Sequence, residues 1–421
     1  MALTSETTLD LVSFAAAIKQ YYRRIDFQKE IYKKFPWLGI IPKDTEFVGS
    51  PLKQPLAFAT VPSRSATFAT AQSAAGSSQQ AAFLVTTVKD YGLAYIDRET
   101  MLASKSDDGA WLKAATHEID MAIKEVTKSA AAALFLDGSG AIGNVASNST
   151  VTGTTIQLTD ARQAVNFQVN DVLQAIPQGS AILNTYASAV RSGTVTLNGV
   201  NRATGVLTAS GNWNSGISAI QTGDYLCKNG DFNNKISGLS AWMPIGGVTN
   251  TSDSFFGVNR SSDSRLAGSY TDGRGMPLEE AIILGAANCA QEGGAPDLVL
   301  LNYRNWVNVI NALGSKKIYF REGKVQADGA DVGYDAVEFE GPAGPMRMVA
   351  DPFCPSNVVY ALETDTWCLH TRGELPHIFD IDGEAGKMLR QATADAYEVR
   401  TGYYGNAVCN APIFNSVIQV S

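Results

Sequence analysis

The sequence has few of the residues from which enzyme, metal and redox sites are built. It contains three histidines and five cysteines, and no cysteine lies in a CxxC pair or at metal-ligand spacing from a histidine. An odd, scattered set of cysteines also argues against a disulfide framework and favours a reducing compartment. No GxSxG and no GxxxxGK(S/T) occurs, so a hydrolase elbow and a P-loop have no support. We therefore predict no enzyme activity, no catalytic residues, no cofactor and no metal.

Charge is also scarce, at 18% charged residues with a net charge of −8. Binding nucleic acid by phosphate neutralisation requires clustered lysine and arginine. The densest basic group, Arg23 to Lys34, is better interpreted as the solvated face of a helix. No run approaches the roughly 18 apolar residues of a membrane span, and polar Met1–Asp10 is not typical of a signal peptide. The low charge fits either extensive subunit contacts or ordinary variation in composition.

Two weak motifs have simpler explanations. Residues 138–143 match GxGxxG, with Asp160 beyond them, but a dinucleotide loop follows a strand and this segment follows a predicted helix. A helix-terminating turn is the better interpretation. The best remaining candidate for a metal or acid–base site is the group His370, Glu374, His377, Asp380 and Asp382. Its spacing fits no metal motif, so polar loop residues between strands are favoured.

A strand-like stretch over residues 46–100 is the most informative feature that is present. It runs out through Leu56, Phe58 and Val61 and returns through Phe83, Val85 and Val88, with small polar residues between. A two-stranded ribbon is marginally stable alone in water. We therefore expect it to lie on a neighbouring molecule. The expected inter-subunit contacts are Leu56, Phe58, Val61, Phe68, Phe83 and Val85.

The rest of the chain divides by periodicity and turn residues. Helical spacing predicts a helix over 9–35, ended by Pro36, and a long helix over 107–136 that Ser106 and Asp107 can cap. Turn dipeptides divide 152–245 into short strands, and 246–276 is predicted to be an irregular connection. Residues 277–313 are predicted to form helix, strand and helix. Later strands are expected at 346–350, 358–362, 397–402 and 414–420.

This order of parts resembles the major capsid protein of tailed bacteriophages, the Hong Kong 97 fold. Three local segments support the resemblance: Phe255–Ser261 with Leu266-Ala267-Gly268, then Gly293–Asp297 followed by Asn302–Trp306, and finally Val349–Pro355. The ending, Tyr397–Arg400 with Pro412, is also similar to the late strands of the family. The order of these pieces, rather than any one of them, carries the resemblance.

The resemblance implies an α+β fold with named parts. These are an N-terminal arm (1–45), an extended loop (46–100), a peripheral domain (101–151) with the spine helix 107–136, a β-rich insertion domain (152–245), a connection (246–276), an axial domain (277–375), and a return through the peripheral domain to a final axial strand (376–421).

The resemblance also implies a function. Copies of the chain would form hexamers and pentamers of an icosahedral shell around double-stranded DNA that is not bound sequence-specifically, assembled in the bacterial host cytoplasm. A portal protein and a possible decoration protein would be partners. Only about 45 residues precede the ribbon, so a separate scaffolding protein is expected. No lysine occurs between Gln54 and Val88, so no covalent crosslink from the ribbon is expected. The alternatives are a nanocompartment shell protein and a β-rich adhesin or tail protein.

Overall fold

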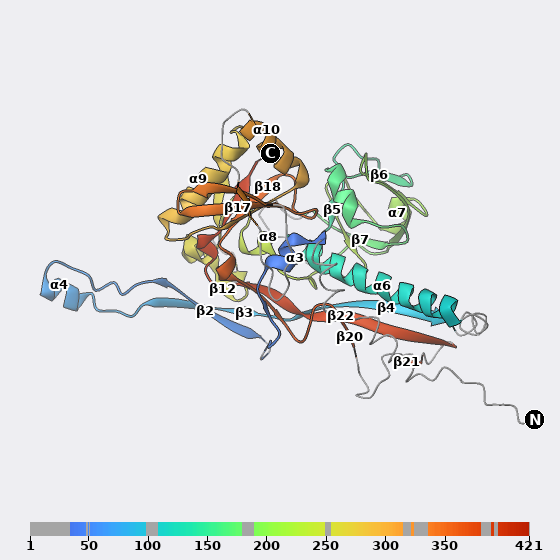
Figure 1. Cartoon of the computed structure of the whole chain (residues 1–421), viewed down its shortest axis with the longest axis horizontal. Helices are drawn as coiled ribbons and strands as arrows, with labels where there is room; N and C mark the ends of the chain where they lie inside the picture. The colour runs from blue at the N-terminus through green and yellow to red at the C-terminus, as the bar shows by residue number, and fades with distance from the viewer. Residues whose placement is uncertain are drawn as a thin grey trace, which may run out of the picture.

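The computed structural model describes residues 34–47, 49, 51–97, 108–178, 189–248, 254–314, 321–323, 336–379, 389–390 and 395–420. The predicted helix over 9–35 lies almost wholly outside these residues, as do the proposed capping residues Ser106 and Asp107. Figure 1 shows a long ribbon that projects from the molecule, a long helix lying along a sheet, and two further bodies on the other side of that helix. None of the described helices is both long and apolar enough to cross a bilayer.

A seven-stranded sheet forms the centre of one of these two bodies. Its order is β13 (Ser269–Asp272), β23 (Ser416–Gln419), β18 (Val358–Leu362), β14 (Leu298–Leu301), β17 (Gly344–Ala350), β16 (Ala336–Gly341) and β15 (Arg321–Gly323). Helices α9 (Leu278–Gln291) and α10 (Tyr303–Gly314) pack on one face. Every residue of β14 and β18 is buried, as expected for central strands covered on both faces. The predicted helix–strand–helix over 277–313 and the strands at 346–350, 358–362 and 414–420 are confirmed.

The segment predicted to be an irregular connection, 246–276, contains a strand of this sheet. Strand β13 pairs in parallel with β23, at the edge of the sheet. A parallel partner that lies more than 140 residues away leaves no local turn signal, so the sequence pattern did not reveal this strand. The segment also contains the short pair β11 (Ser254–Phe255) and β12 (Val258–Asn259), and the 3-10 helices η3 (Arg260–Ser262) and η4 (Ser264–Leu266).

The elongated sheet is built around β22 (Ala396–Cys409). Its other strands are β1 (Lys43–Asp44), β19 (Trp367–Thr371), β20 (His377–Ile378), β21 (Leu389–Arg390) and β4 (Val88–Asp97). The 14 residues of β22 span far more than the predicted 397–402. Strand β4 pairs with β22 over its whole length, from Val88 opposite Gly405 to Asp97 opposite Ala396. Residues 88–97 are therefore part of the elongated sheet, and the prediction that the ribbon continues to residue 100 is wrong.

Helix α6 (Asp108–Ala133) covers one face of the elongated sheet. Ile119, Ile123, Val126 and Ala130 recur at helical spacing, form an apolar stripe on the inward side of α6 and are all buried. The close approach of strand and helix depends on Gly92 of β4, because an added Cβ there would lie 2.6 Å from Val126 Cγ2. After the helix, Gly138 and Gly140 adopt φ of +85° and +83°. The GxGxxG match is thus a helix-terminating turn, as predicted.

The insertion body, residues 143–228, has its own six-stranded sheet. Its order is β5 (Gly143–Asn144), β10 (Tyr225–Lys228), β7 (Val172–Ile176), β8 (Val195–Asn201), β9 (Val206–Ala209) and β6 (Thr155–Gln157), with the 3-10 helix η2 (Ala161–Asn166) and the short α7 (Trp213–Gly216). The predicted range of 152–245 is shifted. Ile236, Leu239 and Trp242, in and before α8 (Leu239–Trp242), belong to the main core of the chain instead.

Three short elements complete the main body: α3 (Pro36–Ile40), η5 (Thr364–Thr366) and η6 (Pro412–Phe414). All five residues of α3 are buried. Asp351, with 1% of its surface exposed, receives a hydrogen bond from the backbone N–H of Trp37 at 3.2 Å and one from Phe353 at 2.9 Å. It thereby satisfies one of the free N–H groups at the start of α3. Burial nevertheless raises the pKa of the Asp351 carboxyl to about 6.

Because the pKa of Asp351 is raised, we expect its contribution to the free energy of unfolding to increase as the pH falls from 7 towards 4. The native carboxyl binds its proton at about pH 6, whereas in the unfolded chain it does so near 3.8, so the native state holds more protons in this window. The free energy of unfolding should rise by up to about 3 kcal/mol from this group. Urea unfolding of the wild type and Asp351→Asn at several pH values checks it. An identical pH dependence in both proteins would contradict the assignment.

Candidate interaction surface

Residues 52–85 form a ribbon that leaves the body of the molecule (Figure 1). This ribbon is called the arm below and is distinct from the N-terminal arm, residues 1–45. Strands β2 (Leu52–Ala59) and β3 (Gln79–Val85) pair antiparallel, with Leu52 opposite Val85 and Ala59 opposite Gln79. A register shift between Ala57 and Ala59 marks a bulge, which increases the local twist of a ribbon. The predicted out-and-back ribbon is therefore present, and it ends at Val85.

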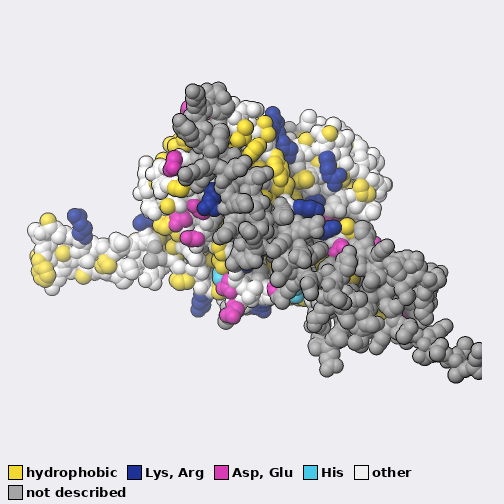
Figure 2. All heavy atoms as spheres, viewed as in Figure 1, with side chains coloured by type: hydrophobic (Ala, Val, Ile, Leu, Met, Phe, Trp, Pro, Cys, Tyr) yellow, Lys and Arg dark blue, Asp and Glu magenta, His cyan; other side chains and the backbone are white. Residues whose placement is uncertain are grey.

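The tip of the arm has no core. No residue from Thr60 to Ala82 is buried, and the helix at the tip, α4 (Phe68–Ser73), buries none of its six residues. Its polar contacts are local: Thr67 Oγ1 donates to Thr70 Oγ1 at 2.7 Å and Ser73 Oγ donates to Thr70 O at 2.9 Å. Phe68 is 82% exposed and Val61 is 50% exposed. Figure 2 shows hydrophobic side chains gathered at the end of the arm.

The base of the arm, in contrast, is locked into the main core. Phe83 packs edge-on against Trp242 and Phe255, with ring centroids 5.1 and 6.2 Å apart. The N–H of Leu84 donates to Phe256 O at 2.9 Å, which joins β3 to the β11–β12 hairpin. Each such aromatic pair contributes about 0.5–1.5 kcal/mol beyond the area it buries. The arm is therefore fixed at one end and without support at the other.

Arg260 completes this base. Arg260 is only 1% exposed, and its guanidinium carbon lies 4.3 Å from the centroid of the Phe255 ring. Arg260 Nη1 donates to Ala241 O at 2.6 Å, so the cation also fixes α8. A cation over an aromatic face is stabilised by the ring quadrupole, more so away from water. Sequence reasoning noticed the segment Phe255–Ser261 but assigned it no such packing role.

The six predicted contact residues fall into three groups. Phe83 and Val85 have 0% exposure in the single chain, so they have no surface left for a neighbour, and their prediction as inter-subunit contacts is wrong. Leu56 and Phe58 are partly buried and pack against the main core. Val61 and Phe68 remain exposed. Alternation along β3 explains the error, because the inward face of the strand meets its own chain rather than another copy.

The described members of the polar group around His370 do not come together at one site. His370 Nδ1 lies 3.1 Å from Asp44 Oδ2, and His377 Nδ1 lies 2.7 Å from Glu374 O, so the two histidines have separate partners. Asp380 and Asp382 lie outside the described residues. Within the described ranges, no three His, Cys, Asp or Glu side chains are placed to hold a metal ion.

All five cysteines are free, and four of them are buried. Burial raises the pKa of the Cys227, Cys289 and Cys409 thiols to about 12, so these three stay protonated near neutral pH.

No protein-family model and no curated protein matches the chain. Solved structures do match it. A chain of the cyanophage A-1(L) capsid asymmetric unit superposes with a TM-score of 0.51 at 11% identity, over 92% of this chain and 92% of that chain.

This chain has a phage capsid-protein fold. Two further structures cover similar shares at lower TM-scores. A chain of the native GTA particle capsid has a TM-score of 0.45 at 8% identity, over 92% of this chain and 90% of that one. A chain of Mycobacterium phage Ogopogo has a TM-score of 0.38 at 9% identity, over 90% of both chains. At 11% identity, the match to the cyanophage capsid chain shows the fold alone and transfers no residue roles.

Proposed function

We propose that this chain is the major capsid protein of a tailed bacteriophage, which assembles by itself into hexamers and pentamers of an icosahedral shell around double-stranded DNA. The observation that carries the proposal is the arm, whose tip from Thr60 to Ala82 has no buried residue in a chain with a capsid-protein fold. A segment of this kind becomes stable when it lies on a neighbouring copy.

In this proposal the arm is the extended loop and α6 is the spine helix of the peripheral domain. The elongated sheet belongs to the peripheral domain, the seven-stranded sheet to the axial domain, and residues 143–228 to the insertion domain. Leu56, Phe58, Val61 and Phe68 are the contact residues that the arm offers. Burying one such large apolar side chain contributes about 1.5–3 kcal/mol, and a closed shell repeats the contact at every copy.

The shell would be held together without covalent bonds. Arg64 is the single charged residue between Gln54 and Val88, so the arm beyond its base, where Lys53 lies, carries no lysine that could form an isopeptide bond. The net charge of −8 favours an inner shell surface that does not bind the phosphates of the packaged DNA. A separate scaffolding protein and a portal protein would be partners, with room for a decoration protein, and assembly would take place in the bacterial cytoplasm. The chain would have no enzymatic role.

Electron microscopy of the chain expressed with and without a scaffolding protein tests this function. Closed shells are expected, and denaturing gels of those particles should show a single band at the mass of one chain. Shells that hold an enzyme cargo and no DNA would instead indicate a nanocompartment, and trimers or fibres would indicate an adhesin or tail protein. A ladder of linked subunits would contradict the non-covalent shell.

A further inference from the structure

The insertion body has a hydrophobic core of its own. The buried residues of this core all lie between Val145 and Leu226, and they include Phe167, Leu197 and Trp213 with 0% exposure. None of them belongs to the two other large cores, which are built from the elongated sheet, α6 and the seven-stranded sheet. A body with a separate core can keep its internal structure when its position changes.

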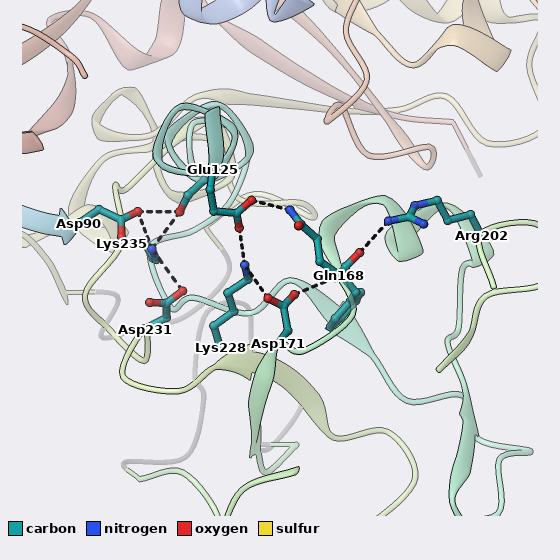
Figure 3. A network of polar contacts seen from close by, with 10 residues as sticks. Asp90, Glu125, Gln168, Asp171, Arg202, Lys228, Asp231 and Lys235 are labelled. Carbon is teal, nitrogen blue, oxygen red and sulfur yellow. Dashed lines mark hydrogen bonds and ion pairs between the residues drawn. The ribbon is translucent and has the colours of Figure 1, made fainter. Parts of the chain in front are cut away.

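The joint between this body and the rest of the chain contains a small apolar cluster, in which Ala141 meets Ile176 and Cys227, and two polar groups. One of the polar groups is centred on Lys228 (Figure 3). Lys228 Nζ, at the end of β10, lies 2.6 Å from Glu125 Oε1 on α6 and 3.0 Å from Asp171 Oδ1 of the insertion body. The amide of Gln168 also donates to Glu125 Oε2. Burial lowers the pKa of Lys228, but Glu125 and Asp171 outweigh it and the pKa is raised, so the ammonium stays charged.

The second polar group is centred on Lys235, which is 7% exposed and fixes the segment that leaves the insertion body rather than the body itself. Its ammonium group lies 2.7 Å from Asp90 Oδ2 of β4 and 3.2 Å from Asp231 Oδ2, and donates to Ser129 Oγ of α6 at 2.9 Å. These three acceptors use all three N–H donors of a lysine. Figure 3 shows the two lysine clusters side by side below α6, both reached from the segment that leaves the insertion body.

The chain enters and leaves the insertion body beside glycines. Gly138 and Gly140 lie on the way in and Gly230 on the way out, with φ of +85°, +83° and +90°. An added Cβ at Gly230 would meet nothing within 4 Å, so this crossing has free space around it. Residues at element ends that tolerate large changes in φ and ψ are the usual hinges.

A cleft lies beside the segment that enters the insertion body, and Leu136 and Ile142 are among the residues that line it. This cleft of about 500 Å³ separates η2 and its surroundings from the loop after β17 and is lined, among others, by Arg162, Asn166, Phe353 and Asn357. The hydroxyl of Ser356 bridges it by donating to Asp160 Oδ2. Protein interiors are normally close-packed, so a cleft of this size leaves room for relative movement.

We propose that the insertion body is a rigid unit that pivots on α6, and that Lys228 and Lys235 form the latch that sets its position. Removing the charges of the latch releases the body without unfolding it, because its apolar core is separate. The movement opens or narrows the cleft between η2 and the loop after β17. The proposal concerns the single chain and is independent of shell formation.

The test is hydrogen–deuterium exchange of the unassembled full chain carrying Lys228→Met and Lys235→Met. Amide exchange at residues 125–133 of α6 and 231–237 should rise at least about tenfold, which corresponds to a loss of about 1.4 kcal/mol of local protection. Exchange in β7, β8 and β10 should change less than about twofold. Arg191→Gln is the matched control, because Arg191 pairs with Asp224 inside the body at 2.6 Å. It should raise exchange in β7 and β10 and leave the joint protected.

Distances between spin labels at Gly211→Cys in the insertion body and Glu280→Cys on α9 provide the second measurement. The distance distribution should broaden or shift in the double lysine variant and stay unchanged in Arg191→Gln. An unchanged distribution, or loss of protection in β7, β8 and β10 together with the joint, would overturn the proposal. If the double variant does not fold, Glu125→Gln removes one latch charge at constant shape and is judged by the same two measurements.

Discussion

Replacing residues 60–78 by an Asn-Gly turn is expected to abolish shells and leave the chain folded. Ala59 and Gln79 are paired, so a two-residue turn can join them within the existing ribbon. The deleted segment contains no buried residue, so the free energy of unfolding should change by less than about 1 kcal/mol. Analytical ultracentrifugation and electron microscopy measure assembly, and urea unfolding measures stability.

A matched pair of substitutions refines this first prediction. Phe68→Asp and Ser77→Asp place the same charge on the same exposed tip, but only Phe68 offers a large apolar side chain. Burying an unpaired charge costs more than the 1.4 kcal/mol of a tenfold change, so Phe68→Asp should reduce shell yield at least about tenfold. Ser77→Asp should assemble almost normally. Wild-type yields from Phe68→Asp and from the deletion would show that the arm is not an inter-subunit contact.

Phe83→Ala is expected to have the largest effect on the stability of the single chain. Phe83 is fully buried against Trp242 and Phe255, where truncation leaves a cavity in the main core. Removing a buried phenylalanine typically costs about 3–5 kcal/mol, a large part of the stability of a domain. Urea unfolding of the unassembled chain measures the change, and assembly should also fail because the base of the arm is no longer fixed.

The neighbouring residue supplies the control for this second prediction. Leu84 belongs to the same strand but points outward and is 39% exposed. Leu84→Ala should lower the free energy of unfolding by less than about 1 kcal/mol, since it leaves no closed cavity. Equal losses for Phe83→Ala and Leu84→Ala would mean that the base of the arm is not the anchor described here.

Local periodicity was sufficient for the elements whose partners are near in the chain. The helix predicted over 107–136 is observed as Asp108–Ala133, and its stripe from Ile119 to Ala130 is buried. The helix–strand–helix at 277–313 and the ribbon through Leu56 and Phe83 are likewise present. Apolar spacing and turn residues encode such elements directly, because helices and hairpins are made by contacts between residues close in sequence.

Long-range pairing decided the rest. Three features depend on segments that lie 145 to more than 300 residues apart in the chain. They are the burial of Phe83 in its own core, the pairing of residues 88–97 with β22, and the ion pair of Lys235 with Asp90. Sequence alone shows that an apolar side chain must be covered. It does not show by what, since burial is non-directional and any apolar surface satisfies it. The periodicity of this chain therefore specified its long helix and its ribbon, while packing in three dimensions selected which face of the arm is buried and which stays exposed.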